Sequence, residues 1–113
     1  MDVKNLTIRE AAALLNSKKI SSVELCSLYL DRIDKVEKSV NALLAVDRDD
    51  VLRQAKESDS RRAAGKQSGE YDGIPVTLKD NIAAKGQRCS CASKILEKFI
   101  SPYDSTVTSK LRN

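Results

Sequence analysis

The chain has 113 residues, of which 41% are hydrophobic and 32% charged, and its 20 Lys and Arg against 16 Asp and Glu give a net charge of +4. This length allows no more than one ordinary domain, and the hydrophobic fraction is too high for a disordered or collagen-like chain. The absence of histidine excludes Ser-His-Asp and Cys-His catalysis, and charges of both signs are too interspersed to form a basic stripe for nucleic acid.

Helices dominate the first half of the predicted structure. In the segments 7–10 (TIRE) and 21–24 (SSVE), a Ser or Thr is followed three residues later by Glu, which is the capping-box pattern at helix starts. These signals, with the apolar periodicity after them, predict helices over about 7–16 and 21–39. Acidic residues at its start and a glycine at its end predict a third helix over about 48–64. The second helix carries one apolar stripe that needs a packing partner, formed by Leu25, Leu28, Tyr29, Ile33, Val36 and Val40.

Strands and short helices are predicted in the rest of the chain. The apolar run 42–46 (ALLAV) and the alternating run 74–78 (IPVTL) indicate two short strands. The polar composition of 65–73 predicts a solvated loop between the third helix and the second strand. Short helices are predicted over about 91–99 and 105–113. Together these elements indicate the α/β class.

The cysteines and the N-terminal residues indicate in which cellular compartment the protein resides. The chain has three cysteines, Cys26, Cys89 and Cys91, and its first residues lack the apolar core of a signal peptide. An odd number of cysteines and no apolar run of membrane-spanning length favour a soluble protein in a reducing setting. We therefore expect a cytoplasmic protein, or one of an organelle matrix if the source is eukaryotic. The Cys-x-Cys pair lacks the spacing and the further ligands of a metal site, so no metal is expected.

Lys79 is the residue that we expect to carry chemistry. It directly follows the predicted strand 74–78, and open α/β sheets place their ligand crevices at the carboxyl ends of strands. Partial desolvation there favours the neutral amine, which can take a proton from a serine hydroxyl in place of a histidine. The alternative, favoured by composition alone, is that residues 79–81 (KDN) form a polar surface turn.

Several segments, in order and in register, resemble a known family. They are 72–82 (DGIPVTLKDNI), 85–86 (KG), 91–97 (CASKILE) and 102–107 (PYDSTV). The set is similar to the amidase signature family, and within it to the A subunits of glutamyl-tRNA(Gln) amidotransferases. The earlier segments 22–25 and 40–42 are similar as well, so the resemblance covers nearly all of the chain. It implies that residues 1–113 form the N-terminal portion of an amidase-signature domain, an α/β fold with a mixed sheet flanked by helices and rich in helix over these residues.

The resemblance also implies an activity. The family uses a triad of Ser, cis-Ser and Lys, and the resemblance assigns the lysine to Lys79. It implies an amidase subunit that hydrolyses glutamine and supplies ammonia for transamidation of mischarged Glu-tRNA(Gln), or of Asp-tRNA(Asn), with a free small amide as the other open substrate. The implied partners are the amidotransferase B and C subunits, and the tRNA is reached through the partner subunit. ATP and magnesium are expected at the partner, with no cofactor, membrane contact or direct nucleic-acid site in this chain.

Two interpretations of these residues remain open. In the family, the Gly- and Ser-rich segment with both catalytic serines corresponds to positions beyond residue 113, so we expect a truncated N-terminal quarter that is inactive alone. Ser90 and Ser93 are expected to lie on a helix surface, and Cys89 or Cys91 to be small buried residues rather than a thiolate nucleophile. The second interpretation is a non-catalytic helical module that binds the partner subunit. A small RNA-binding protein is disfavoured because it would need a clustered basic face.

Overall fold

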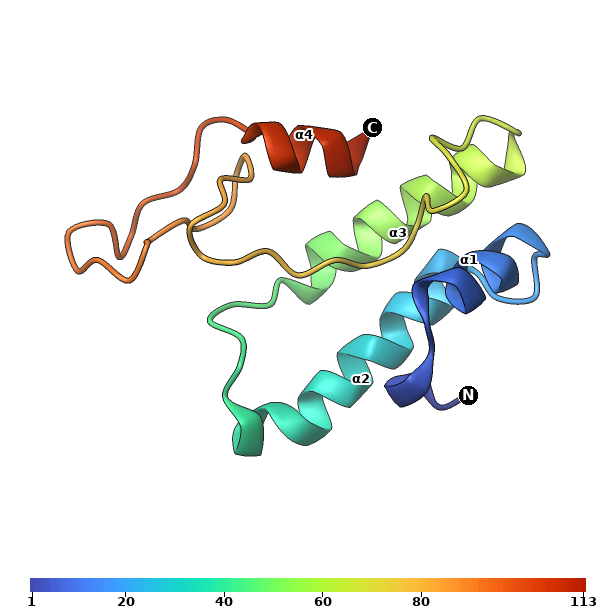
Figure 1. Ribbon diagram of the computed structural model, residues 1–113, viewed down its shortest axis with the longest axis horizontal. Helices are drawn as coiled ribbons and strands as arrows, with labels where there is room; N and C mark the ends of the chain where they lie inside the picture. The colour runs from blue at the N-terminus through green and yellow to red at the C-terminus, as the bar shows by residue number, and fades with distance from the viewer. The chain divides into compact units, whose positions relative to one another are not determined.

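The computed structural model describes residues 1–113 and divides them into two units, residues 1–75 and 76–113 (Figure 1). The first unit contains a short 3-10 helix η1 (Val3–Asn5) and helices α1 (Ile8–Asn16), α2 (Ser22–Val40) and α3 (Arg48–Ala63). The second contains α4 (Thr106–Arg112). The sequence predicts helices over 7–16, 21–39, 48–64 and 105–113, so each of these helices begins and ends within a residue or two of its expected bounds.

Both capping boxes are present. At α1, the Thr7 hydroxyl accepts from the Glu10 N–H at 3.2 Å, and the Glu10 carboxylate accepts from the Thr7 N–H at 2.8 Å. At α2, Ser21 and Glu24 make the same pair of hydrogen bonds at 3.1 and 2.8 Å. The backbone N–H of the capping residue, and then its hydroxyl, hold the pKa of each glutamate below its ordinary value. These reciprocal bonds satisfy helix N–H groups that would otherwise lack partners, which is why the two helices begin where they do.

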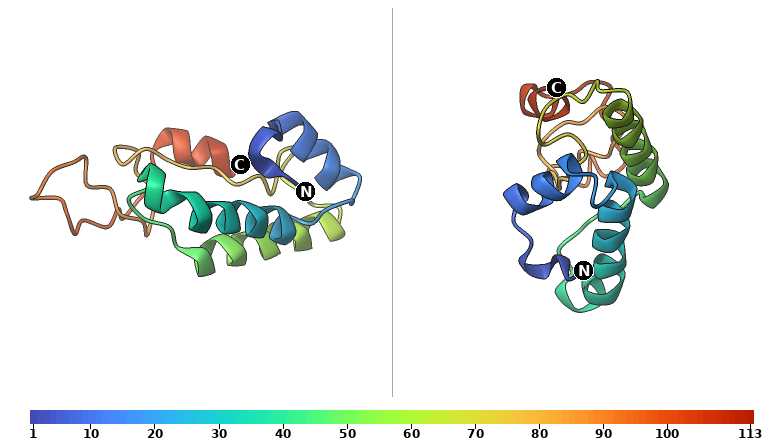
Figure 2. Two further views of the ribbon diagram at one scale, coloured as in Figure 1. Left: turned by 90° about the horizontal axis from the view of Figure 1, so that it is seen from below. Right: turned by 90° about the vertical axis from the view of Figure 1, so that its right-hand side faces the viewer.

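The helices end in left-handed residues. After α3, Gly65 has a φ of 69°, its N–H donates to the Arg62 carbonyl, and the Lys66 N–H donates to the Arg61 carbonyl at 2.7 Å. This pair of bonds is the Schellman arrangement, and a glycine accepts the positive φ without steric cost. Asn41 takes the same conformation after α2, with a φ of 52°. The chain therefore reverses after each helix, and α2 and α3 lie antiparallel and side by side (Figure 2).

The core of the first unit is small and aliphatic. Its buried cluster consists of Ala11, Leu15, Ile20 and Leu25, with Tyr29, Leu28 and Ile74 packed against it. Full burial of a leucine such as Leu15 or Leu25 contributes about 2 kcal/mol. The predicted apolar stripe of α2 is buried only at its start: Leu25 is fully buried, whereas Val40 at the other end is 62% exposed.

The predicted solvated loop 65–73 is tied to the helices at its end. The Arg61 guanidinium donates two hydrogen bonds to the Asp72 carboxylate, at 2.9 and 2.7 Å, and that carboxylate is only 5% exposed. The Ser22 hydroxyl donates to the Gly73 carbonyl at 2.7 Å. The Asp59 carboxylate in turn accepts from the backbone N–H of Ser22 at 2.7 Å. These bonds fix the end of the loop against the helices of the first unit.

Three predicted elements are absent. The structure contains no strand at 42–46 or 74–78, and the single β contact is an isolated antiparallel bridge between Arg88 and Ile100. A strand is stable only when a neighbouring strand accepts its hydrogen bonds, and neither segment has such a neighbour among these residues. The side chains of Leu44 and Val76 are accordingly 70% and 60% exposed. The expected sheet is therefore not seen in this stretch of chain.

The helix predicted over 91–99 is the third of these, and it is wrong. Cys91 and Ala92 have φ values of 51° and 57°, which a right-handed helix cannot contain. The segment forms successive turns instead, in which the N–H of Leu96 donates to the Ser93 carbonyl at 3.1 Å and that of Phe99 to the Leu96 carbonyl at 2.9 Å. The left-handed pair excludes a right-handed helix at the first two predicted positions, and the turns that follow do not join into one.

The second unit is mostly loop, held together by hydrogen bonds around Ala83 and Ser101. The Ala83 carbonyl accepts from the Ser105 N–H and from the Thr108 hydroxyl, both at 2.8 Å. The Ser101 carbonyl accepts from the Gly86 N–H at 2.8 Å. Ser105 also N-caps α4 by accepting from the Thr108 N–H at 3.2 Å. Side chain and backbone bonds, rather than a core, thus fix the loop that contains Lys79.

Candidate functional site

Lys79 lies in a stretch without regular secondary structure that directly precedes a turn. The residue is exposed, and its ammonium group has no hydrogen-bond or ion-pair partner. Its carbonyl accepts from the Ile82 N–H at 2.9 Å, which closes a turn over residues 79–82. In this stretch of chain Lys79 therefore has the geometry of a surface turn, and its role as a proton-transfer group remains a prediction.

The next residue, Asp80, organises the loop that follows. Its carboxylate accepts from the Ser90 N–H at 2.8 Å and from the Ser90 hydroxyl. The Ser90 hydroxyl, then the backbone N–H groups of Ser90 and Ala92, lower the pKa of Asp80, and the Arg88 charge adds to this. The carboxylate is thus kept ionised and bonded. It closes the segment from Asp80 to Ser90 into a loop directly after Lys79.

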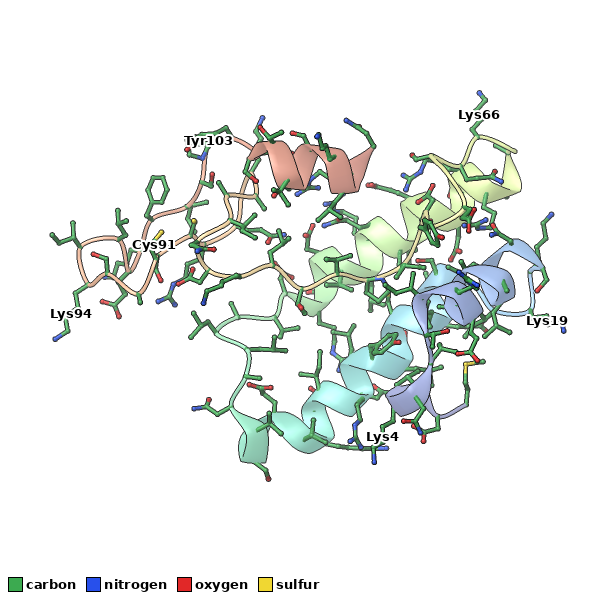
Figure 3. All side chains as sticks on the ribbon, viewed as in Figure 1. Lys4, Lys19, Lys66, Cys91, Lys94 and Tyr103 are labelled. Carbon is green, nitrogen blue, oxygen red and sulfur yellow. The ribbon has the colours of Figure 1, made fainter.

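Two cysteines donate hydrogen bonds to the backbone carbonyl of Asp80. The Asp80 carbonyl accepts from the Cys91 N–H at 2.9 Å and from the Cys89 thiol at 3.7 Å. Cys89 is buried and Cys91 is exposed; Figure 3 shows Cys91 in the loop stretch that precedes α4. The expectation of a small buried residue therefore holds for Cys89 and fails for Cys91, because the left-handed turn at Cys91 presents it to solvent.

The two serines considered from sequence lie in turns rather than on a helix. Ser90 is only 3% exposed, and its hydroxyl donates a hydrogen bond to the Asp80 carboxylate. The hydroxyl therefore has a structural role in closing the loop. The Ser93 N–H donates to the Ser90 carbonyl at 2.9 Å, which makes it part of the next turn. The prediction that both occupy a helix surface is wrong, since residues 91–99 form no helix.

Sequence reasoning missed two carboxylates that fix the backbone by hydrogen bonds, Asp80 next to Lys79 and Asp72 in the first unit. Asp80 was visible only as part of a polar KDN turn, because its partner Ser90 stands ten residues further along the chain. Asp72 falls in a segment predicted to be a solvated loop, because its partner Arg61 stands eleven residues before it. Neither pair has a local pattern that would reveal it.

Lys79 lines neither of two surface depressions, and the structure has no cluster of metal ligands. Two shallow surface depressions are lined only by residues of the first unit, one along α3 and one beside the start of α2. The structure has no group of three or more His, Cys, Asp or Glu side chains that could hold a metal ion. None of its helices is long and apolar enough to cross a lipid bilayer.

The family follows from the sequence of the loop and of the helices before it. The model of the amidase family matches residues 24–113, which include most of α2, all of α3 and the Lys79 loop. The chain belongs to the amidase family. The resemblance of the segments around Lys79 to this family is thereby confirmed.

Two curated relatives are A subunits of the same kind of enzyme. The A subunit of the glutamyl-tRNA(Gln) amidotransferase of Dechloromonas aromatica strain RCB is 45% identical over 107 residues, which are 95% of this chain and 22% of the relative. The A subunit of the same enzyme from Thermosynechococcus vestitus is 48% identical over 105 residues, which are 93% of this chain and 22% of the relative. This amidase-family chain therefore spans about a fifth of the length of the curated relatives that it matches.

A solved structure shares the fold. The native peptide amidase of Stenotrophomonas maltophilia superposes on this chain with a TM-score of 0.88 at 28% sequence identity, covering 96% of this chain and 23% of that one. Residues 1–113 therefore have the fold of one part of an amidase-signature enzyme.

Proposed function

We propose that this chain is the lysine-bearing part of a glutamine-hydrolysing amidase subunit, which supplies ammonia for the transamidation of mischarged Glu-tRNA(Gln) or Asp-tRNA(Asn). The observation that carries the proposal is the 45–48% identity, over more than nine tenths of the chain, to the A subunits of two glutamyl-tRNA(Gln) amidotransferases. A free small amide is the competing substrate class, and the 28% identity to a peptide amidase gives it weaker support.

In this proposal Lys79 is the proton-transfer residue. Its amine takes a proton from a serine hydroxyl, directly or through a second serine, while that hydroxyl attacks the carboxamide carbon of glutamine. The proton passes to the departing amino group as its bond to carbon breaks, so that it leaves as ammonia. Water then hydrolyses the glutamyl ester left on the serine and releases glutamate. Both serines are supplied by polypeptide that residues 1–113 do not include, so these residues alone are inactive.

The hydrogen bonds after Lys79 support this role because they limit the movement of its loop. The Asp80–Ser90 bonds fix the chain directly after it. A proton-transfer group must be held within hydrogen-bond reach of its partner, so a fixed backbone beside it favours catalysis. The amidation step itself belongs to partner chains, which we propose to be the B and C subunits, with ATP and magnesium bound at the partner.

The test replaces part of a relative with this chain. Residues 1–113 are grafted onto the Dechloromonas aromatica protein in place of the matched stretch, and the hybrid is purified with its B and C subunits. We expect glutamine hydrolysis, measured as glutamate release, and its loss by a factor of at least about 100 in Lys79→Ala. Lys98→Ala, which removes an exposed lysine from the same unit, is the matched control and leaves the rate unchanged. A hybrid that folds and keeps its rate in Lys79→Ala refutes the assignment.

A second function has its own support. The first unit has its own aliphatic core, two capping boxes and the Arg61–Asp72 ion pair, and it does not include Lys79. Such a unit would serve as a non-catalytic helical module that binds the partner subunit. This alternative predicts saturable binding of residues 1–113 to the purified B subunit, measured by calorimetry, and no effect of Lys79→Ala on it. A hybrid without glutaminase activity, together with such binding, would favour the module.

A further inference from the structure

Cys89 and Cys91 are brought together by the carbonyl oxygen of Asp80. The Cys91 N–H and the Cys89 thiol both donate to that oxygen, at 2.9 and 3.7 Å. The Cys89 N–H also donates to the Phe99 carbonyl at 3.2 Å, so the backbone of this cysteine is held on two sides. Burial raises the pKa of the Cys89 thiol, and the thiol of Cys91 raises it further. The shared carbonyl oxygen holds the Cys89 sulfur close to the backbone of Cys91.

The two thiols differ in access to solvent. Cys91 is exposed, whereas Cys89 is only 7% exposed. A dissolved oxidant therefore meets Cys91 first, and Cys89 is placed to react with whatever forms on Cys91. This is the arrangement of an attacking and a resolving cysteine. Cys26, at 4% exposed in α2, has Ser22 and not a cysteine beside its sulfur, so it serves as an internal control.

We propose that Cys89 and Cys91 form a reversible disulfide, which makes the loop after Lys79 a thiol-modification site. With oxidised glutathione as the oxidant, the Cys91 thiolate attacks one glutathione sulfur, forms a mixed disulfide and releases one glutathione thiolate. The Cys89 thiolate then attacks the Cys91 sulfur, closes the Cys89–Cys91 bond and releases the second glutathione. Two protein thiols are oxidised, one glutathione disulfide is reduced, and the two protons pass to the released thiolates.

Oxidation changes the loop through one bond. The Cys89 sulfur loses its hydrogen, so it can no longer donate to the Asp80 carbonyl. The Asp80 carbonyl then keeps only the Cys91 N–H as a donor. Because Asp80 directly follows Lys79, oxidation of the two cysteines changes the hydrogen bonding in the loop of the proposed function. The modification itself does not depend on that function.

The test uses oxidised glutathione on residues 1–113 under native conditions, followed by acid quenching and alkylation. Trypsin cleaves after Arg88 and Lys94, so the peptide 89–94 (CSCASK) contains both cysteines, whereas Cys26 lies in the peptide 20–32. We expect the peptide 89–94 to lose two hydrogen atoms and to resist alkylation, and the Cys26 peptide to be alkylated in full. Dithiothreitol restores alkylation of all three cysteines.

Two variants complete the experiment. In Cys89→Ser, Cys91 has no resolving thiol, so the product is a stable glutathione adduct on the peptide 89–94. In Cys26→Ser, closure of the pair is unchanged. A wild-type product that stays glutathionylated at Cys91, that links two chains, or that joins Cys26 to either residue overturns the proposal. The peptide assignment is made on wild type, so it holds even where a variant fails to fold.

Discussion

The Asp80 carboxylate accepts two hydrogen bonds from Ser90, one from its N–H at 2.8 Å and one from its hydroxyl. This pair joins two residues ten positions apart and closes the loop that follows Lys79. A hydrogen bond to a charged group contributes about 1.5–3 kcal/mol. This side-chain pair therefore contributes to the order of the loop, together with the backbone bonds at Gly86 and Cys89.

Ser90→Ala should loosen the loop without unfolding the first unit. The variant keeps the N–H bond and loses the hydroxyl bond, so opening of the loop becomes easier by about 1.5–3 kcal/mol. Amide hydrogen exchange at Cys91, whose N–H donates to the Asp80 carbonyl, measures this. Ser93→Ala is the control, since only the backbone of Ser93 is hydrogen bonded. Equal exchange in the two variants would show that the hydroxyl does not hold the loop.

The same pair predicts a titration. The Ser90 hydroxyl is the leading cause that lowers the pKa of Asp80. Ser90→Ala should therefore move the pKa of Asp80 upward, toward its ordinary value of about 4, and leave a smaller depression from the remaining N–H groups. The carboxyl carbon shift of Asp80, followed by NMR from neutral to acid pH, measures the change. A pKa of Asp80 that is the same in wild type and variant contradicts it.

The Arg61–Asp72 pair predicts how the stability of the first unit changes with pH. The Arg61 guanidinium holds the pKa of Asp72 well below its usual range. A depressed carboxyl pKa contributes stability that is fully present above the unfolded-state pKa of about 4 and is lost as the pH falls toward the folded-state value. Asp72→Asn should therefore destabilise residues 1–75 by about 2 kcal/mol at neutral pH, and the difference from wild type should shrink only below about pH 4.

Urea unfolding followed by far-ultraviolet circular dichroism measures that difference. The control is Asp31→Asn, which removes a carboxylate that is 62% exposed and 3.7 Å from Arg48. An exposed pair of this kind contributes less than about 1 kcal/mol. If the two variants lose the same stability at neutral pH, burial of the Asp72 carboxylate has no energetic consequence.

The features that were predicted correctly from sequence are those that depend on residues close together in the chain. The capping boxes at Thr7 and Ser21 and the Gly65 stop signal need only residues within one or two turns, so the helix bounds followed from local pattern. Strands at 42–46 and 74–78 depend on partners far along a chain, which no local pattern provides. The left-handed turn at Cys91 was missed for a related reason: it is fixed by bonds to Asp80, and a non-glycine residue gives no warning of it.

Gly73 carries the last prediction, because its conformation and its surroundings both exclude a side chain. Its φ is 95°, and a Cβ atom there would lie 2.6 Å from the Ser58 hydroxyl oxygen and 2.9 Å from that of Ser22. Both serines are fully buried, so neither can move aside easily. Gly73→Ala therefore combines backbone strain of about 1 kcal/mol with overpacking of about 1–3 kcal/mol. It also disturbs the Ser22–Gly73 bond that ties the end of the loop 65–73 to α2.

The matched control is Gly65→Ala, which separates these two causes. Gly65 also has a positive φ, 69°, but an added Cβ there meets nothing within 4 Å. It should lose only about 1 kcal/mol of unfolding free energy, whereas Gly73→Ala should lose at least about 2 kcal/mol. Adding Ser58→Ala to Gly73→Ala removes the nearest clashing oxygen and should recover part of the loss, measured by urea unfolding. If Gly65→Ala and Gly73→Ala cost the same, or if Ser58→Ala recovers nothing, steric exclusion by the two buried serines is not what requires glycine at position 73.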